Sequence, residues 1–279
     1  MSGRTIDVDG NNVWVVEEGD GEPLVYMHGF ADVPGLCSEI PPLQTELAKN
    51  FQVIAPAHPA CSKSDERDDL DTMEDLVFHY LDVFNALSLE KFHLVGACLG
   101  GWVAAEIAIR YPEKINTLSL LGATGLFVKG HSIADLFWVA QPENGLYYND
   151  LRNLLFVGPN SKIGKERFPD GRGKLEQELL RYGMFRFASR FGFSPPYMHN
   201  RKLQGHLRRY EGPAQIIWGK EDHLVPREHA TAYSEGLGQA PVDLIEDCGH
   251  SVQVEAPGTT ASLLTNFIAG QVSYNATQF

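Results

Sequence analysis

The sequence of 279 residues lacks any apolar run near the length of about 20 residues that a membrane-spanning helix needs. It contains only four cysteines, at positions 37, 61, 98 and 248, and none of them forms a C-x-x-C motif. Basic residues are also scarce, because 23 Lys and Arg stand against 36 Asp and Glu, and the net charge is −13. These absences argue against a membrane protein, a disulfide scaffold, a metal protein and a nucleic-acid-binding protein.

The first residues do not resemble a secretory leader. Residues 1–4 run directly into a strand-like stretch without an apolar segment between them. We therefore expect a cytoplasmic protein with reduced thiols. Hydrophobic residues make up 43% of the chain and charged residues 21%, which predicts a sizeable folded core.

Short apolar segments alternate with helix-like segments along most of the chain. This alternation predicts an α/β fold, in which helices cover both faces of a mostly parallel sheet. The strands are expected at residues 5–8, 13–17, 24–27, 51–55, 92–95, 115–121, 214–218 and 242–245. The clearest helices are expected at residues 76–87, 102–110 and 259–269, and a capping box of Thr72 and Asp75 precedes the first of them.

Residues 126–210 differ in composition from the rest of the chain. They contain 14 of the 23 basic residues but 7 of the 36 acidic residues, so their net charge is +7 against −20 for the remainder. They also contain 14 of the 29 aromatic residues. This shift predicts an inserted module, with helices near 133–138, 150–156 and 174–191, in a core formed by 1–125 and 211–279.

The segment Gly96-Ala97-Cys98-Leu99-Gly100 lies between an expected strand and an expected helix. This G-x-C-x-G pattern is typical of a nucleophile elbow, a sharp turn that exposes its central side chain and needs glycines where backbones approach closely. The N-terminus of the helix that follows favours an anion at this point. We therefore predict that Cys98 is a nucleophilic thiol, and not a small buried apolar side chain.

The sequence resembles the α/β-hydrolase superfamily over nearly its whole length, through five motifs in the order that this superfamily shows. The motifs are Met27-His28-Gly29-Phe30, a loop ending in Ser64-Asp65, the elbow, Trp218-Gly219-x-x-Asp222-x-x-x-Pro226 and Cys248-Gly249-His250. The basic insertion falls between the sixth and seventh core strands, where this superfamily carries its cap. The resemblance therefore implies an α/β-hydrolase fold with an inserted helical cap, similar to capped esterases and meta-cleavage carbon–carbon hydrolases.

Carried onto this sequence, the resemblance implies a triad of catalytic residues and no cofactor or metal. Cys98 would be the nucleophile, His250 the base and Asp222 the carboxylate that orients the base. The backbone N–H groups of Phe30 and Leu99 would form the oxyanion hole.

Other residues near these motifs have competing or structural interpretations. Glu221, Glu246 and Asp247 are alternative acids for His250. His28 is expected to pack under the oxyanion loop. No catalytic role is expected for His58, His223, Cys37, Cys61 or Cys248.

The resulting hypothesis is hydrolysis of a small-molecule carboxylic ester, lactone or thioester through an S-acyl enzyme. An anionic substrate is a further expectation, because the insertion is basic and Arg181, Arg186 and Arg190 recur at helical spacing. For these arginines, a solvated helix face is the competing interpretation.

Two alternatives for the function stay open. The first is a carbon–carbon hydrolase or lyase of an aromatic-degradation intermediate, although Ala97 stands where that group typically has Asn. The second is a ligand-binding protein of the same fold with little turnover, against which the complete triad argues. Most capped relatives have Ser at the elbow, so Cys98 is either the native nucleophile or a replacement for a serine.

Overall fold

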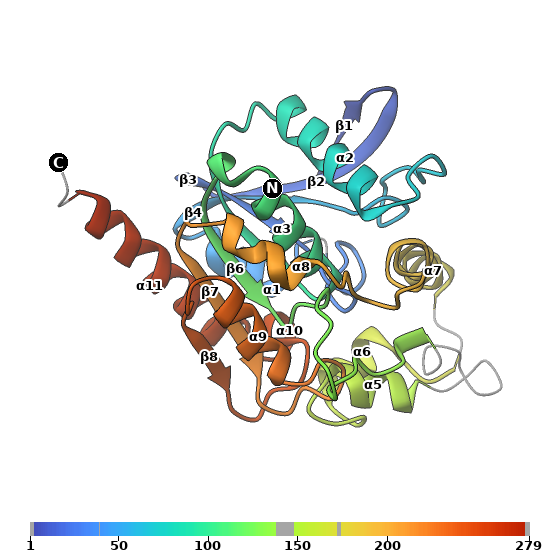
Figure 1. The fold of residues 1–279 in the computed structure, drawn as a ribbon. Helices are drawn as coiled ribbons and strands as arrows, with labels where there is room; N and C mark the ends of the chain where they lie inside the picture. Colours follow the sequence, from blue (N-terminus) through green and yellow to red (C-terminus); the bar gives the residue numbers. More distant parts are fainter. Residues whose placement is uncertain (1–2, 39, 138–147, 172–173, 277–279) are drawn as a thin grey trace.

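The computed structural model describes residues 3–38, 40–137, 148–171 and 174–276. An eight-stranded sheet with the order β1-β2-β4-β3-β5-β6-β7-β8 forms its centre (Figure 1). The strands are β1 (Arg4–Val8), β2 (Asn11–Glu18), β3 (Glu22–Met27), β4 (Phe51–Pro56), β5 (Phe92–Ala97), β6 (Ile115–Leu121), β7 (Ala214–Gly219) and β8 (Val242–Ile245). All eight predicted strands are present, and the predicted fold class is confirmed.

Strand direction follows from the connections. β1 and β2 form an antiparallel hairpin, and β2 also pairs antiparallel with β4. The remaining neighbours, from β4 through β3 to β8, pair in parallel. The carboxyl ends of these parallel strands therefore share one edge of the sheet, where α/β proteins place their sites.

Helices cover both faces of the sheet because neighbouring strand residues point to opposite sides. Val25 and Met27 pack into the core under α2, α3 and α9, whereas Leu24 and Tyr26 pack into the core under α1 and α11. The helices outside the insertion are α1 (Pro42–Leu47), α2 (Met73–Ala86), α3 (Leu99–Arg110), α9 (Glu228–Gly236), α10 (Val252–Glu255) and α11 (Pro257–Ala276), with the 3-10 turn η1 (Pro112–Lys114).

The predicted capping box at the start of α2 is confirmed. The Thr72 side chain accepts a hydrogen bond from the backbone N–H of Asp75, and the Asp75 carboxylate accepts one from the backbone N–H of Thr72. The helix therefore begins three residues before the apolar pattern at 76–87, because the cap and not the pattern fixes its first turn.

The inserted helices lie between β6 and β7, on the side of the sheet away from α11 (Figure 1). They are α5 (Asn149–Leu155), α6 (Lys162–Arg167), α7 (Leu175–Phe191) and α8 (Leu203–His206), followed by the 3-10 turn η2 (Leu207–Arg209). The helices predicted at 150–156 and 174–191 are present. Of the helix predicted at 133–138, residues 133–135 are not helical, residues 136 and 137 are helical, and residue 138 lies outside the described residues. The short helix α6 was not predicted, because its polar sequence has no apolar periodicity.

The first turn of α3 packs tightly against the end of β3. A Cβ atom on Gly100 would lie 2.3 Å from the carbonyl oxygen of Met27 and 2.5 Å from that of His28. Neither backbone oxygen can move without displacing the strand end, so this position requires glycine.

We expect Gly100→Ala to lower the free energy of unfolding by about 1–3 kcal/mol in urea denaturation, because of this overlap. Gly205→Ala is the matched control, since nothing lies within 4 Å of a Cβ atom there and alanine favours the helix. Equal stability of the two variants would contradict the close packing of α3 on β3.

Candidate active site

Four loops at the carboxyl edge of the sheet carry the predicted site residues. Phe30 follows β3, Cys98 follows β5, Asp222 follows β7 and His250 follows β8. Their side chains are 2% exposed or less, so the site is largely withdrawn from solvent. In such an environment, electrostatic interactions are stronger than at the surface.

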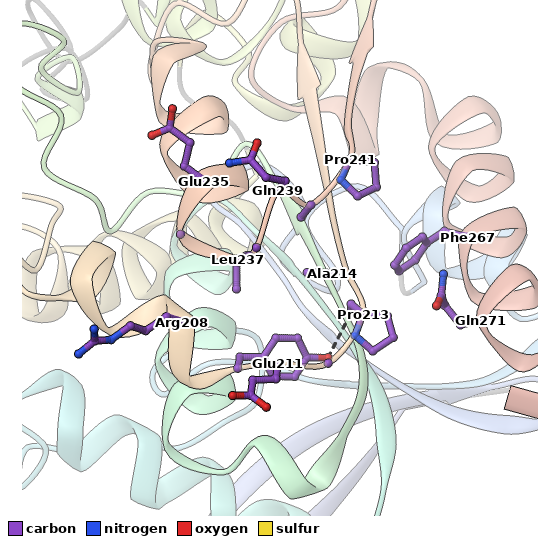
Figure 2. Close-up of a pocket in the computed structure, with 15 residues that line it drawn as sticks. Arg208, Glu211, Pro213, Ala214, Glu235, Leu237, Gln239, Pro241, Phe267 and Gln271 are labelled. Carbon is purple, nitrogen blue, oxygen red and sulfur yellow. Dashed lines mark hydrogen bonds between the residues drawn. The ribbon is translucent and has the colours of Figure 1, made fainter. Parts of the chain in front are cut away.

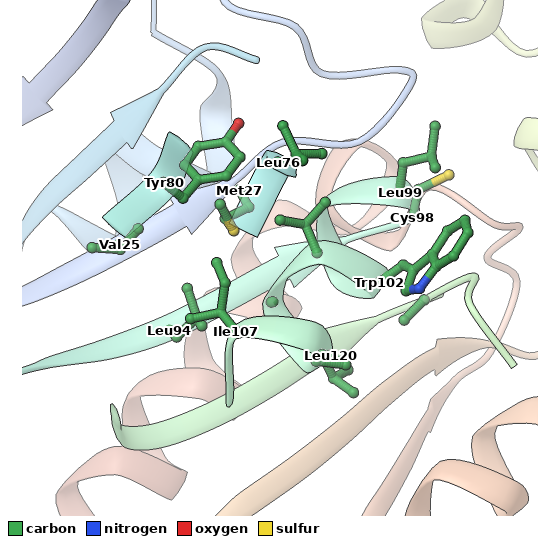
Figure 3. Packing of buried hydrophobic residues seen from close by; sticks show 14 of the residues in the cluster. Val25, Met27, Leu76, Tyr80, Leu94, Cys98, Leu99, Trp102, Ile107 and Leu120 are labelled. Atoms are coloured by element: carbon green, nitrogen blue, oxygen red, sulfur yellow. The ribbon is translucent and has the colours of Figure 1, made fainter. Parts of the chain in front are cut away.

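Cys98 occupies a strained turn between β5 and α3. Its backbone angles are φ 52° and ψ −120°, which a non-glycine residue adopts only where its surroundings enforce it. A Cβ atom on Gly96 would lie 2.4 Å from the carbonyl oxygen of Gly100, so the turn cannot relax at that point. Figure 3 shows the Cys98 sulfur and Leu99 at this junction, with Trp102 one turn further along α3.

A short hydrogen bond joins the predicted base to the predicted acid. His250 Nδ1 lies 2.8 Å from Asp222 Oδ2, and both side chains are buried. The other carboxylate oxygen, Asp222 Oδ1, accepts hydrogen bonds from the backbone N–H groups of Leu224 (2.9 Å) and Val225 (2.8 Å). The carboxylate is therefore held by three donors, and it fixes the orientation of the imidazole ring.

The charges around His250 favour its protonated form. Burial alone would lower the pKa of His250, but the Asp222 carboxylate and the Cys98 thiolate outweigh it and raise this pKa well above its usual range. The second ring nitrogen, Nε2, is buried without a nitrogen or oxygen partner among the described residues. Gly122 leaves room for the ring, since a Cβ atom there would lie 3.2 Å from His250 Nδ1.

Two backbone N–H groups flank the nucleophile. Neither the N–H of Phe30 nor that of Leu99 donates a hydrogen bond to another described residue. A Cβ atom on Gly29 would lie only 3.0 Å from Cys98 Cβ, so the loop after β3 passes directly beside the elbow. Unpaired N–H groups at a helix N-terminus and beside a nucleophile can stabilise an oxyanion.

Two of the three alternative acids have other partners. Glu246 forms an ion pair with Lys220, and Glu221 accepts a hydrogen bond from the backbone N–H of Cys248.

Two other cysteines are buried. Burial and the nearby Glu255 raise the pKa of Cys248 to about 12, and burial also raises the pKa of Cys61. These two thiols are therefore held in their protonated, unreactive form.

The histidines near the loops have structural contacts. His28 Nε2 accepts a hydrogen bond from the backbone N–H of His58 (3.1 Å), and the His58 ring stacks on Phe187 of α7. Burial lowers the pKa of both histidines, so both are neutral. No catalytic role is predicted for His58; the structure shows that its side chain is buried and that it connects the core to the insertion. His223 Nδ1 lies 3.0 Å from the backbone oxygen of Asn153.

The arginines predicted to attract an anion are paired with acidic residues of this chain. The buried Arg181 pairs with Glu178. Arg186 and Arg190 reach out of α7 to the loop before α2, and their partners there are Glu66, Asp68 and Asp71. The structure therefore supports neither free anion ligands nor a solvated helix face at these positions; two of the three fasten the insertion to the core.

Two buried charged residues near the site were not recognised in the sequence. Asp32 is 2% exposed, and its carboxylate bonds to the oxyanion loop at Gly29. Arg167, at the end of α6, is 7% exposed, has no ion pair or side-chain hydrogen bond among the described residues, and buries an unpartnered Nε. The proximity of Asp32 to the oxyanion motif could have marked it, whereas no pattern in the sequence marks Arg167.

A separate pocket of about 770 Å³ opens at the amino ends of β7 and β8, opposite the edge that carries the triad (Figure 2). Its lining includes Pro213, Leu237, Pro241 and Phe267.

Among the described residues, no group of three or more His, Cys, Asp and Glu side chains is placed to hold a metal ion. No described helix combines the length and the apolar character that crossing a membrane requires.

Comparison with known proteins places the chain among hydrolases. A 2-hydroxymuconate semialdehyde hydrolase of Pseudomonas sp. (strain CF600) is 28% identical over 96% of this chain and 94% of that protein. Monoacylglycerol lipase abhd6-A of Xenopus laevis is 25% identical over 90% of this chain and 76% of that protein.

The fold also matches solved structures. A meta-cleavage product hydrolase from Pseudomonas fluorescens IP01 superposes with a TM-score of 0.78 at 21% identity, and the match covers 96% of this chain and 98% of that chain. The model of the α/β-hydrolase fold family matches residues 22–257, which include the elbow and the loops of Asp222 and His250. The chain therefore belongs to the α/β-hydrolase fold family and is a hydrolase.

Proposed function

We propose that this protein hydrolyses a small carboxylic ester, thioester or lactone through a Cys98–His250–Asp222 triad. The observation that carries the proposal is the 2.8 Å bond between His250 and Asp222 beside a cysteine on a strained elbow. A thiolate next to an imidazolium is a nucleophile already prepared for attack.

In the proposed first half-reaction, the Cys98 thiolate attacks the substrate carbonyl carbon. The carbonyl oxygen becomes an oxyanion that accepts hydrogen bonds from the N–H groups of Phe30 and Leu99. As the tetrahedral intermediate collapses, the imidazolium of His250 donates its proton to the leaving alcohol or thiol, and an S-acyl enzyme forms.

In the proposed second half-reaction, neutral His250 removes a proton from water while the water oxygen attacks the S-acyl carbon. The carbon–sulfur bond breaks, the acid leaves and the thiolate–imidazolium pair is restored. Asp222 keeps the imidazole in one orientation throughout. No cofactor is needed for either step.

We further propose that residues 126–210 act as a cap over a core formed by 1–125 and 211–279. The insertion contacts the oxyanion loop directly, because Phe168 stacks on Phe30 with ring centroids 6.1 Å apart and Phe185 meets the same ring edge-on at 5.0 Å. Aromatic side chains placed this way form an apolar wall for an acyl group.

Carbon–carbon bond hydrolysis is the second candidate, because a relative along nearly the full length is named a 2-hydroxymuconate semialdehyde hydrolase. The same three residues would serve that reaction. A vinylogous diketone substrate separates the two candidates, since only a carbon–carbon hydrolase cleaves it. A ligand-binding protein with little turnover would show no burst of product with a chromogenic ester.

We expect Cys98→Ala and His250→Ala to abolish turnover of p-nitrophenyl esters, because the first removes the nucleophile and the second removes the base. Asp222→Asn should lower kcat by roughly 10²–10⁴ while the protein stays folded. It should also lower the pKa of His250, since the carboxylate raises it, and NMR titration of the imidazole measures this shift. Full activity of Cys98→Ala would overturn the triad.

Cys98→Ser tests whether the site is built for sulfur. A loss of activity indicates that the imidazole is matched to a thiolate, whereas higher activity indicates that cysteine replaces a serine at this elbow. Mass spectrometry should detect an acyl adduct on Cys98 with a slow ester, because hydrolysis of the S-acyl enzyme depends on His250.

We propose that the substrate carries an anionic group and that Arg167 is the cation that receives it. Arg167 lies in the insertion directly before Phe168, which packs on the oxyanion residue Phe30. Burial and the Asp32 carboxylate raise the pKa of the buried Tyr26 hydroxyl, and the Arg167 charge lowers it. The Cys98 charge also raises this pKa, so Arg167 and Cys98 act electrostatically on the same hydroxyl. A buried cation without a protein partner is costly unless a ligand completes it.

We expect Arg167→Met to lower kcat/KM for the mono-p-nitrophenyl ester of glutaric acid about 10–100-fold, the value of a charge-assisted hydrogen bond. Activity on neutral p-nitrophenyl valerate should stay within about threefold. Arg201→Met, which removes a cation of the same segment that lies over Phe127, is the control and should leave both rates unchanged. Equal losses on both esters would show that Arg167 is structural only.

A further inference from the structure

Asp32 forms a junction of three hydrogen bonds behind the oxyanion loop. Its Oδ1 accepts from the backbone N–H of Gly29 (2.8 Å) and from the side-chain amide of Gln253 (3.0 Å). Its Oδ2 accepts from the hydroxyl of Tyr26 (2.6 Å). Asp32 has no ion pair with a described Lys, Arg or His, so a carboxylate that is 2% exposed is held by neutral donors alone.

Each of the three donors belongs to a different part of the site. Tyr26 lies in β3, Gly29 precedes the oxyanion residue Phe30, and Gln253 lies in α10, three residues after His250. One carboxylate therefore ties the strand end, the oxyanion loop and the segment behind the catalytic histidine to one another. Gln253 is 221 residues away from Asp32 along the chain, whereas Tyr26 and Gly29 are its near neighbours.

We propose that Asp32 is a positioning residue that fixes the Phe30 N–H relative to Cys98 and His250, an inference that rests on the proposed triad. Gly29 is closely packed between the elbow and Asp32, since a Cβ atom there would lie 3.0 Å from Cys98 Cβ and 3.2 Å from Asp32 Oδ1. The Asp32–Gly29 bond therefore sets the peptide that leads into Phe30. An oxyanion donor acts only when it is aimed at the place where the charge develops.

This role differs measurably from a purely structural one. A misplaced oxyanion donor weakens binding of the transition state and leaves binding of the ground-state ester nearly unchanged. The role therefore predicts a loss in kcat with little change in KM. An aldehyde that adds to Cys98 as a thiohemiacetal places an oxygen at the same position, so its inhibition constant should rise together with the loss in kcat.

We expect Asp32→Ala to lower kcat for p-nitrophenyl valerate about 100-fold, the effect of losing one oxyanion donor, with KM within about threefold. Asp32→Asn should recover kcat to within about tenfold of the unchanged protein, because the amide oxygen still accepts from Gly29. Gln253→Met removes one donor at nearly constant volume and should lower kcat several-fold if Asp32→Ala does not fold.

Glu106→Ala is the matched control. Glu106 is also a fully buried carboxylate with neutral side-chain donors, Trp102 at 3.0 Å and Asn200 at 2.9 Å, and it additionally pairs with Arg110; it lies on α3 away from the oxyanion loop. Its loss should lower the free energy of unfolding while kcat per folded molecule stays within about threefold.

The outcomes separate this proposal from the proposed triad. If the unchanged protein forms an acyl adduct on Cys98 and Asp32→Ala keeps the same kcat and aldehyde affinity, Asp32 has no positioning role although the triad stands. If Asp32→Asn is as impaired as Asp32→Ala, the hydrogen bond to Gly29 is not what matters, and the proposal is overturned. If the unchanged protein forms no adduct, the proposed function fails first.

Discussion

The left-handed backbone at Cys98 is the constraint on which the rest of the site depends. A non-glycine residue can keep φ 52° between a buried strand and a buried helix only if the neighbouring residues have no side chains that would collide with the turn. Gly96 and Gly100 meet this condition, because a Cβ atom at either position would overlap backbone oxygen atoms. This turn places the thiol at the carboxyl edge of the sheet, and the Leu99 N–H next to it donates to no acceptor among the described residues.

The proposed base and acid of this site are each other's charged counterparts. Asp222 uses one oxygen for His250 and the other for two backbone N–H groups, and this arrangement raises the pKa of His250 against the effect of burial. Arg167 and Asp32 differ from this pair, since neither forms an ion pair with a described residue; the Asp32 carboxylate is held by three neutral donors, and Arg167 buries an unpartnered Nε. The lack of a described partner for Arg167 is the observation on which the proposal of an anionic substrate rests.

The basic insertion and the acidic core attract each other through specific pairs. Arg190 donates to the backbone oxygens of Asp68 and Leu70 and pairs with Asp71, so α7 is fixed to the loop before α2. Two basic residues of 126–210, Arg186 and Arg190, are therefore paired with core carboxylates at this contact. The sequence related the charge imbalance to an anionic substrate, whereas in the structure two of the three arginines named for that role join the insertion to the core.

The sequence by itself determined the parallel sheet, the elbow and the order of the motifs, because these depend on local apolar runs, on Gly96 and Gly100 and on the cap at Thr72. It also marked Asp222 and His250 through short patterns. Only the tertiary structure decided that Asp222, and not Glu221 or Glu246, meets His250. It alone brought Gln253 to Asp32, across 221 residues of chain, and placed Arg167 where no described residue forms an ion pair with it, because such arrangements depend on segments far apart in the chain that no local pattern relates.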